Sequence, residues 1–451
     1  MKNILVLGAG LSASSLIKYL LENSTKYDWK IKIGDISEEI AKEKASWHKN
    51  GEGFAFDVKN EEQLEILVKD ADIVVSMLPA FMHFSVAEAC VRLGKNMVTA
   101  SYVSKEIKTL DEEAKKKGVL LLNEIGVDPG IDHMSAMEVI DRIKSAGGKV
   151  IDFESSTGGL VAPKYDNNPW NYKFTWNPRN VVLAGQGTSQ FLHNGRYKYI
   201  PYNKLFQRTE RINVLDLGEF EVYGNRDSLS YRNIYGLNDV QTMFRGTIRR
   251  VGYARAWDVF VQLGMTDDSY IYEGSKEHTY HQFINSFTKY CTDKPVDIKV
   301  SEYLGIDPES IIMYMIRWTG IFENKVIGLD NATPAQILQH LLEQKWGMEP
   351  DDKDMIVMQH QFVYELNNQR KKIFSTMVVY GEDQIHTAMS ITVGTPVAIA
   401  VKMILTGEIK STGVKIPVDK DIYEPILKEL KDYKVMFVED EIDWNNEEEG
   451  I

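Results

Sequence analysis

Residues 4–13 read Ile4-Leu5-Val6-Leu7-Gly8-Ala9-Gly10-Leu11-Ser12-Ala13, and residues 31–35 read Ile31-Lys32-Ile33-Gly34-Asp35. The first run predicts a strand, a sharp glycine turn and the start of a helix that continues through the apolar positions 16–21. Gly8 permits the turn, Gly10 lets backbone N–H groups approach a pyrophosphate, and the helix N-terminus adds partial positive charge. Asp35 ends the second strand, where a carboxylate can accept hydrogen bonds from a ribose. This order predicts a nicotinamide dinucleotide site at residues 8–13 and 35.

Composition sets the class of protein. A chain of 451 residues is too long for one core, so we expect two or three domains. The net charge of −13 disfavours nucleic-acid binding, since no basic excess exists to release counterions. Cys90 and Cys291 are too far apart to suggest a disulfide scaffold or metal knuckle, which favours a reducing cytoplasm. We expect no cleavable signal, no apolar run able to span a membrane, and a solvated acidic tail at 447–451.

The pattern up to about residue 129 alternates between strands and helices, as in parallel βαβ units. We expect strands at 54–56, 73–77, 96–100 and 119–122, and helices at 38–47, 61–68, 83–93 and 105–117. Ligands on such a sheet bind beyond the carboxyl ends of the strands. Residues there include Leu78, Pro79, Ser101 and Tyr102.

The pattern changes after residue 130. A helix is expected at 131–145, strand-like alternation at 150–155, a β-hairpin at 355–366 and 372–380, and helices between 270 and 346. Pro396 is expected to open a buried helix at 397–405. The fold class is therefore α/β. We expect a doubly wound Rossmann domain at 1–129, joined by about 390–451, a mixed α/β domain at 130–269 and 347–389, and a smaller helical domain at 270–346.

Polar groups suited to an anionic ligand gather in four stretches, 123–133, 168–179, 224–228 and 244–247. Two of them contain the strings GVDPGIDH at 126–133 and KFTWNPR at 173–179. These strings resemble the saccharopine dehydrogenases that form L-glutamate, and the resemblance extends over nearly the whole chain, including 389–396 and 412–417.

The resemblance implies a reversible oxidation at a secondary amine, in which saccharopine, NAD(P)+ and water give 2-aminoadipate semialdehyde, L-glutamate and NAD(P)H. It also implies an active site between the domains, and a homodimer. Because saccharopine carries three carboxylates, its site needs guanidinium groups. By resemblance, Arg226 and Thr247 contact the substrate, and substrate meets nicotinamide at Ser101 and Asp128. The cofactor would also contact Leu78, Pro79, Val127 and either Phe174 or Trp176.

Other roles follow from residue type alone. Arg179 and Arg245 are candidate anionic anchors, and Tyr102 and Asp128 are candidates for handling the proton. The alternatives are structural: Arg226 could pair with Asp227, and Asp128 could cap the following helix. His133 could be a general base or a packed helix residue. His278 and His281 lie three apart without supporting carboxylates or cysteines, so no metal site is expected.

Two signals bear on the cofactor. Ala13 at the third glycine position is frequent in NADP enzymes, whereas Asp35 would repel a 2′-phosphate and no Arg stands among the following residues 36–39. NAD is therefore favoured, with NADP as the alternative. Two other functions stay open: a related reductase that forms carboxynorspermidine, whose pocket should favour acids, and a non-catalytic dinucleotide-binding protein.

Overall fold

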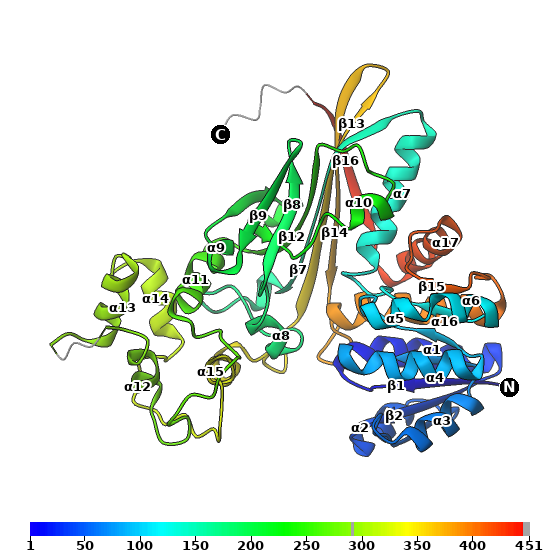
Figure 1. The fold of residues 1–451 in the computed structure, drawn as a ribbon, viewed down its shortest axis with the longest axis horizontal. Helices are drawn as coiled ribbons and strands as arrows, with labels where there is room; N and C mark the ends of the chain where they lie inside the picture. The colour runs from blue at the N-terminus through cyan, green and yellow to red at the C-terminus, as the bar shows by residue number, and fades with distance from the viewer. Residues whose placement is uncertain (290–292, 445–451) are drawn as a thin grey trace. The chain divides into compact units, whose positions relative to one another are not determined.

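The computed structural model describes residues 1–289 and 293–444, which separate into two compact units by their internal contacts (Figure 1). Unit 1 comprises Met1–Val150, Tyr364–Lys371 and Met377–Asp440. Unit 2 comprises Ile151–Val363, Lys372–Thr376 and, at the end of the described chain, residues 441–444. Cys291 and the acidic tail at 447–451, for which the sequence suggested roles, lie outside the described residues.

Unit 1 is built on a seven-stranded sheet with the order β15-β6-β5-β4-β1-β2-β3. Every neighbouring pair is parallel, and the order reverses between β1 and β4, which confirms the doubly wound Rossmann fold. The strands are β1 (Lys2–Leu7), β2 (Trp29–Asp35), β3 (Gly51–Ala55), β4 (Ile73–Ser76), β5 (Asn96–Val98), β6 (Leu120–Leu122) and β15 (Gly413–Lys415).

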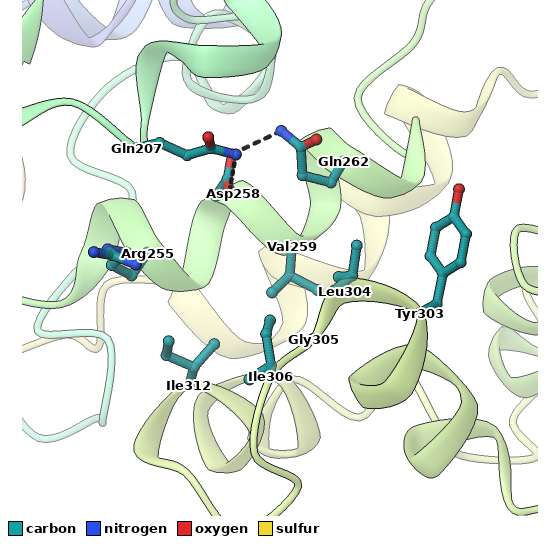
Figure 2. A pocket seen from close by; sticks show the side chains of 10 residues that line it. All are labelled: Gln207, Arg255, Asp258, Val259, Gln262, Tyr303, Leu304, Gly305, Ile306 and Ile312. Atoms are coloured by element: carbon teal, nitrogen blue, oxygen red, sulfur yellow. Dashed lines mark hydrogen bonds between the residues drawn. The ribbon is translucent and has the colours of Figure 1, made fainter.

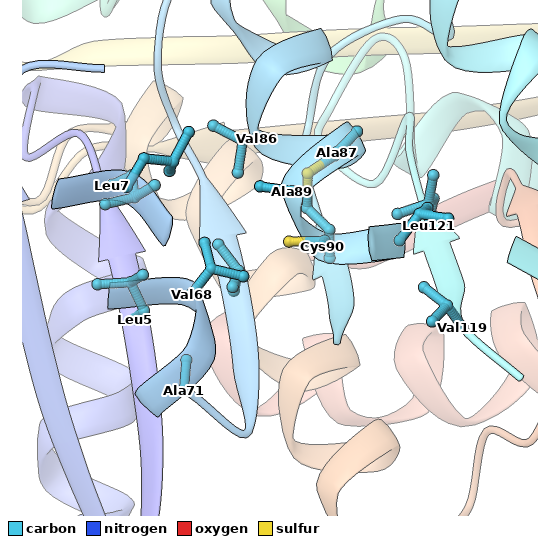
Figure 3. Packing of buried hydrophobic residues seen from close by; sticks show 14 of the residues in the cluster. Leu5, Leu7, Val68, Ala71, Val86, Ala87, Ala89, Cys90, Val119 and Leu121 are labelled. Carbon is cyan, nitrogen blue, oxygen red and sulfur yellow. The ribbon is translucent and has the colours of Figure 1, made fainter. Parts of the chain in front are cut away.

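The helices of unit 1 follow the strands as crossovers. Figure 3 shows one apolar layer, in which Leu5 and Leu7 of β1 pack in the same buried cluster as Val86 and Cys90 of α4. Such burial on the sheet explains why the strands read as continuous apolar runs. The helices are α1 (Ser14–Tyr27), α2 (Glu38–Ala45), α3 (Glu61–Asp70), α4 (His83–Leu93), α5 (Lys105–Thr109), α6 (Asp111–Lys117), α7 (Ile131–Ser145), α16 (Ala388–Thr406) and α17 (Lys420–Leu430), with short 3-10 turns η1 (Leu11–Ala13), η2 (Ala80–Met82) and η5 (Lys431–Tyr433).

Helix α16 corrects two expectations. It begins at Ala388 and not at Pro396, because the Thr387 hydroxyl caps it by accepting the Ser390 N–H at 3.0 Å. Pro396 lies in the helix interior, where it removes one backbone donor within a helix that packing holds in place. The helix is also long and apolar enough to cross a membrane, contrary to the expectation of no such run. The most apolar window is 72% buried inside the structure, as in a core helix.

The C-terminal segment packs onto unit 1 through α16. A Cβ added at Gly394 would lie 2.8 Å from the Leu16 backbone nitrogen and 3.0 Å from the Ser12 oxygen. The backbone of α16 therefore approaches the start of α1 more closely than any side chain would permit. The Ser390 hydroxyl also accepts the Ser15 N–H at 2.9 Å. Further on, β15 extends the sheet beside β6.

The second sheet is a nine-stranded mixed sheet, most of whose residues belong to unit 2. Its main path is β10-β11-β12-β7-β13-β14-β16, with β8 beside β12 and β9 beside β8. The pair β12 and β7 is parallel, whereas β11 runs antiparallel to both β10 and β12. The strands are β7 (Lys149–Val161), β8 (Thr188–His193), β9 (Arg196–Pro201), β10 (Thr209–Asn213), β11 (Glu219–Gly224), β12 (Thr242–Arg250), β13 (Asp354–Leu366), β14 (Gln369–Tyr380) and β16 (Phe437–Asp443).

The helical segment at 270–346 belongs to unit 2 and does not separate from its sheet as a unit of its own. Helix α7, which we expected to open the mixed domain, belongs to unit 1, whose first segment extends to Val150. The helices of unit 2 are α8 (Pro178–Val182), α9 (Tyr202–Leu205), α10 (Tyr231–Ile234), α11 (Tyr253–Leu263), α12 (Tyr280–Asn285), α13 (Val296–Leu304), α14 (Ile311–Trp318) and α15 (Pro334–Trp346), with short turns η3 (Pro163–Tyr165) and η4 (Leu215–Leu217).

Candidate active site

The glycine turn has the geometry that a dinucleotide requires. Gly8 has φ +99°, and a Cβ there would lie 2.7 Å from the Met77 carbonyl oxygen of the neighbouring strand end. Both the positive φ and the nearby carbonyl oxygen therefore exclude a side chain at position 8. Gly10 is exposed, and no atom lies within 4 Å of a Cβ built on it, so a phosphate can reach the backbone there. Leu11 is exposed, Ser12 is half-buried and Ala13 is buried under the turn. This cradle fits a nicotinamide dinucleotide.

The Asp35 carboxylate holds the turn in place. Its Oδ2 accepts the Ala9 N–H at 2.7 Å and its Oδ1 accepts the Ser37 N–H at 2.9 Å. These bonds fix the carboxylate at the end of β2, beside the position that a ribose occupies in this fold.

A buried cation that no sequence motif marks lies beneath the same turn. Lys44 on α2 is 7% exposed, and its Nζ donates to the Gly10 carbonyl at 2.9 Å and to the Ser14 hydroxyl at 2.7 Å. Burial lowers the pKa of Lys44 to about 8, although the charges of Glu43 and Asp35 oppose that shift. A lysine nine residues after Asp35 carries no signature that would have marked it.

The strand ends of unit 1 bring a serine that was expected at the site into a hydrogen-bonded chain. Ser101 Oγ lies 2.7 Å from His83 Nε2, and His83 Nδ1 lies 2.8 Å from Ser76 Oγ. Ser76 ends β4, His83 begins α4, and Ser101 follows β5. Neither Ser76 nor His83 was singled out from the sequence.

The two residues expected to handle the proton meet. The Tyr102 hydroxyl donates to Asp128 Oδ1 at 3.2 Å, and Tyr102 is 37% exposed. Asp128 does not cap α7, because the N-cap is Gly130 and its N–H donates to Asp132 Oδ1 at 2.6 Å. The other residues expected to contact the cofactor differ in exposure: Leu78 is half-buried, Pro79 is exposed and Val127 is buried.

His133 packs in the interior and contacts the carboxylate of Glu124. It is fully buried, and its Nε2 lies 2.9 Å from Glu124 Oε2. The other carboxylate oxygen of Glu124 accepts the Val103 N–H at 3.0 Å. Glu124 therefore ties the loop at 123–133 to the segment that follows β5, and His133 holds the carboxylate in place. This setting matches the packed-residue alternative.

In unit 2, strand β12 presents a row of polar side chains. Side chains two apart on a strand share a face, so Arg245, Thr247 and Arg249 lie on the same side of the sheet. Tyr223 of β11 pairs in register with Thr247 and joins that face. Arg249 was not singled out, although the alternation Arg-Gly-Thr-Ile-Arg at 245–249 could have indicated it.

Arg249 is a buried cation without an acidic partner among the described residues. It is 3% exposed, and its guanidinium carbon lies 5.1, 5.9 and 5.3 Å from the ring centroids of Tyr172, Tyr223 and Tyr253. Its Nη1 donates to the Ile248 carbonyl at 2.8 Å, and its Nε has no hydrogen-bond partner within residues 1–289 and 293–444. Burial raises the pKa of all three tyrosines, so they stay neutral and leave the charge of Arg249 uncompensated.

The other expected arginines occupy three different settings. Arg226 is exposed with φ +46° and forms no ion pair with Asp227, whose carboxylate accepts the Leu229 N–H at 2.8 Å. Arg179 pairs with Asp268, so its charge is already compensated within unit 2. Arg245 is buried, with its guanidinium 4.5 Å from the ring centroid of Tyr231.

The two aromatic residues expected at the cofactor differ in exposure. Phe174 is buried in an aromatic cluster, 5.3 Å from the ring centroid of Trp346 and 6.2 Å from that of Tyr172. Trp176 is half-buried. Tyr172, in the same stretch, is one of the three tyrosines whose rings surround Arg249.

A separate cavity of about 740 Å³ lies in unit 2 between α11 and the end of α13 (Figure 2). Asp258 accepts hydrogen bonds from Gln207 and Gln262 at its wall, each at 3.0 Å. None of the residues expected at the active site lines it. Among the residues that the structure describes, no group of three or more His, Cys, Asp or Glu side chains could hold a metal ion.

Comparisons with known proteins show which family this chain is similar to. Residues 4–122 match the family model described as saccharopine dehydrogenase NADP binding domain, and residues 126–435 match that of the saccharopine dehydrogenase C-terminal domain. A structure of apo histidine-tagged saccharopine dehydrogenase (L-Glu forming) from Saccharomyces cerevisiae superposes with a TM-score of 0.87 at 30% identity, covering 98% of this chain and 100% of that one.

Relatives in sequence carry related names. The chain is 32% identical over 440 residues to saccharopine dehydrogenase [NADP(+), L-glutamate-forming] of Saccharomyces cerevisiae, covering 96% of this chain and 97% of the relative. It is also 32% identical over 445 residues to the mitochondrial alpha-aminoadipic semialdehyde synthase of Mus musculus, covering 97% of this chain. The chain spans about half the length of that synthase, 47%.

Proposed function

Because the chain belongs to the saccharopine dehydrogenase family, we propose that it interconverts saccharopine with L-glutamate and 2-aminoadipate 6-semialdehyde in lysine metabolism. Unit 1 has the fold and the glycine turn of a nicotinamide dinucleotide-binding domain. When bound, the dinucleotide supplies hydride transfer to or from the carbon beside the secondary amine. The protein supplies binding, orientation and a place for the proton.

The observation that carries the proposal is the uncompensated Arg249. A buried guanidinium is costly unless an anion joins it, and three neutral tyrosines do not supply one. A carboxylate is the natural partner, because it accepts two parallel hydrogen bonds from a guanidinium. Saccharopine offers three carboxylates, and the exposed Arg226 provides a second cation for another of them.

The same observation weighs against the alternatives. A substrate with more ammonium groups, as in carboxynorspermidine formation, calls for acidic side chains where this chain places Arg249. A protein that only senses dinucleotides has no use for a buried cation in a second unit. Both alternatives therefore leave the cost of burying Arg249 unexplained.

For the proton, we assign Tyr102 and Asp128. The Tyr102 hydroxyl donates to the Asp128 carboxylate, which has further lone pairs to accept a proton, at the carboxyl ends of the parallel strands where a ligand of this fold binds. Oxidation of the secondary amine requires that its nitrogen lose a proton, which this pair can accept. Reduction in the opposite direction returns it.

The test is absorbance of the reduced cofactor, measured with saccharopine and either NAD+ or NADP+. Turnover of saccharopine supports the proposal. Turnover of carboxynorspermidine without turnover of saccharopine would favour the related reductase. Absence of any reduction, in a protein that still binds the dinucleotide in a fluorescence titration, would favour the non-catalytic alternative.

For the cofactor, we infer a preference for NAD. Asp35 is fixed at the end of β2 with one negative charge, and a 2′-phosphate beside it would be repelled. Residues 36–39, Ile-Ser-Glu-Glu, add further negative charge and no arginine. The yeast relatives are named for NADP(+), so the ratio of kcat/KM for the two cofactors is the deciding measurement. The homodimer and the cytoplasmic location stay predictions.

A further inference from the structure

A hydrogen-bonded chain of three side chains crosses the strand ends of unit 1. Ser76 is fully buried, His83 is 1% exposed, and Ser101 is half-buried. The imidazole lies between the two hydroxyls, with Nδ1 2.8 Å from Ser76 Oγ and Nε2 2.7 Å from Ser101 Oγ. Both ring nitrogens are therefore used, and one end of the chain reaches the edge of the sheet where ligands bind.

The imidazole in this setting is neutral. Burial lowers the pKa of His83 to about 4, so one ring nitrogen donates a proton and the other accepts one at neutral pH. The tautomer of His83 decides which serine hydroxyl donates to the ring and which accepts from it. If Nδ1 carried the hydrogen, the hydroxyl hydrogen of Ser76 would have to find another acceptor.

The part of the chain that the structure describes offers Ser76 no such acceptor. Among the described residues, its hydroxyl makes one hydrogen bond, the contact with His83. A buried hydroxyl hydrogen without an acceptor is unfavourable, so Ser76 donates to Nδ1 and the ring hydrogen sits on Nε2. The Nε2–H then donates to Ser101 Oγ, which leaves the hydrogen of the Ser101 hydroxyl free for another acceptor.

We propose that His83 is a positioning residue, which accepts from Ser76, donates to Ser101, and so fixes the Ser101 hydroxyl as a donor toward a carboxylate or carboxamide oxygen of a bound ligand. The carboxylate would belong to the amino-acid substrate and the carboxamide to the nicotinamide. The identity of the substrate carboxylate rests on the proposed function. The donor and acceptor directions of the hydrogen bonds from Ser76 through His83 to Ser101 do not depend on it. The backbone also holds Ser101, since its carbonyl accepts the Glu124 N–H at 3.0 Å.

The decisive experiment is a double-mutant cycle between His83→Phe and Ser101→Ala. Loss of one hydrogen bond to a charged or polar ligand group is expected to weaken binding about tenfold. The readouts are kcat and KM for saccharopine, and the dissociation constant of the reduced dinucleotide from its fluorescence. A raised KM for saccharopine identifies the substrate carboxylate, and a raised dissociation constant identifies the carboxamide. His83→Gln, which keeps a donor, should restore part of the loss.

The cycle separates positioning from a structural role. If His83 acts through Ser101, the double variant is no worse than Ser101→Ala alone. If His83→Phe causes the same loss with and without the Ser101 hydroxyl, the proposal is overturned. Thermal unfolding of each variant checks that the loss of binding is not a loss of the fold.

A second measurement does not depend on turnover. The 15N spectrum of histidine-labelled protein should show the Nε2–H tautomer for His83, and Ser76→Ala should shift that signal toward a mixture of tautomers. A wild-type spectrum with the hydrogen on Nδ1 would overturn the inference. If saccharopine is not a substrate, the proposed function fails, while the tautomer and the dinucleotide affinity still decide the role of His83.

Discussion

Replacing Arg249 with Met is expected to abolish most saccharopine turnover while leaving the fold intact. The guanidinium is 3% exposed, lies within 6 Å of three tyrosine ring centroids and has no acidic partner in the described part of the chain. If a substrate carboxylate completes this cluster, the variant leaves that carboxylate desolvated and unpaired. Truncating one partner of such a pair costs about 3 kcal/mol, which corresponds to roughly a 150-fold fall in kcat/KM.

The free energy of unfolding of Arg249→Met should differ little from that of the wild type. Removing a buried charge relieves its desolvation, and the unpartnered Nε no longer needs a hydrogen bond. The loss of the cation–π contacts with the tyrosines opposes that gain. Because these terms have opposite sign, we expect the free energy of unfolding to change by less than about 2 kcal/mol. Urea denaturation measures this change.

The matched control is Arg211→Met. Arg211 also lies on a strand of unit 2, but it is half exposed and pairs with Glu219 at 2.9 Å. Its loss should leave kcat/KM within about twofold, because exposed ion pairs contribute little. An Arg249→Met variant whose kcat/KM for saccharopine stays within about threefold of wild type would refute this role of Arg249. The role is also refuted if activity falls only in proportion to the fraction of unfolded protein.

Three further predictions concern unit 1. Asp35→Ala should raise kcat/KM for NADP+ relative to NAD+ by about tenfold, since it removes the repulsion of a 2′-phosphate; an unchanged ratio would show that Asp35 does not set the preference. The pKa of Lys44 is about 8, so below pH 8 its ammonium attracts the pyrophosphate and above pH 8 that attraction is lost. The dinucleotide dissociation constant should therefore rise as the pH passes 8, and a slope retained by Lys44→Met would contradict this. Gly394→Ala should destabilise unit 1 by about 1–3 kcal/mol in urea denaturation, because its Cβ would lie 2.8 Å from the Leu16 nitrogen; an unchanged midpoint would mean that α16 has room to shift.

Sequence determined the parts of this protein that depend on neighbours along the chain. The glycine turn and Asp35 lie within one βαβ unit, and each apolar strand is a short run, so periodicity and spacing report their local geometry directly. The doubly wound parallel sheet could be predicted from the alternation of strands and helices, whereas the order of its strands came from the structure. The family, too, could be identified from short strings such as GVDPGIDH, which the comparisons confirm.

Tertiary structure decided the parts that depend on residues far apart in the chain. His83 looks like an ordinary first residue of a helix until β4 and β5 bring Ser76 and Ser101 to its two nitrogens. In the sequence, Gly394 is one small residue in an apolar run, and only the packing of α16 on α1 shows why a glycine is needed there. The start of α16 was predicted wrongly from Pro396, because capping by Thr387 outweighs the preference of proline for the first turn. Strand alternation could have placed Arg249 on one face with Arg245 and Thr247, but only the structure showed that Arg249 is buried among neutral tyrosines. Burial and hydrogen-bond partners are properties of the packed chain, and no local pattern encodes them.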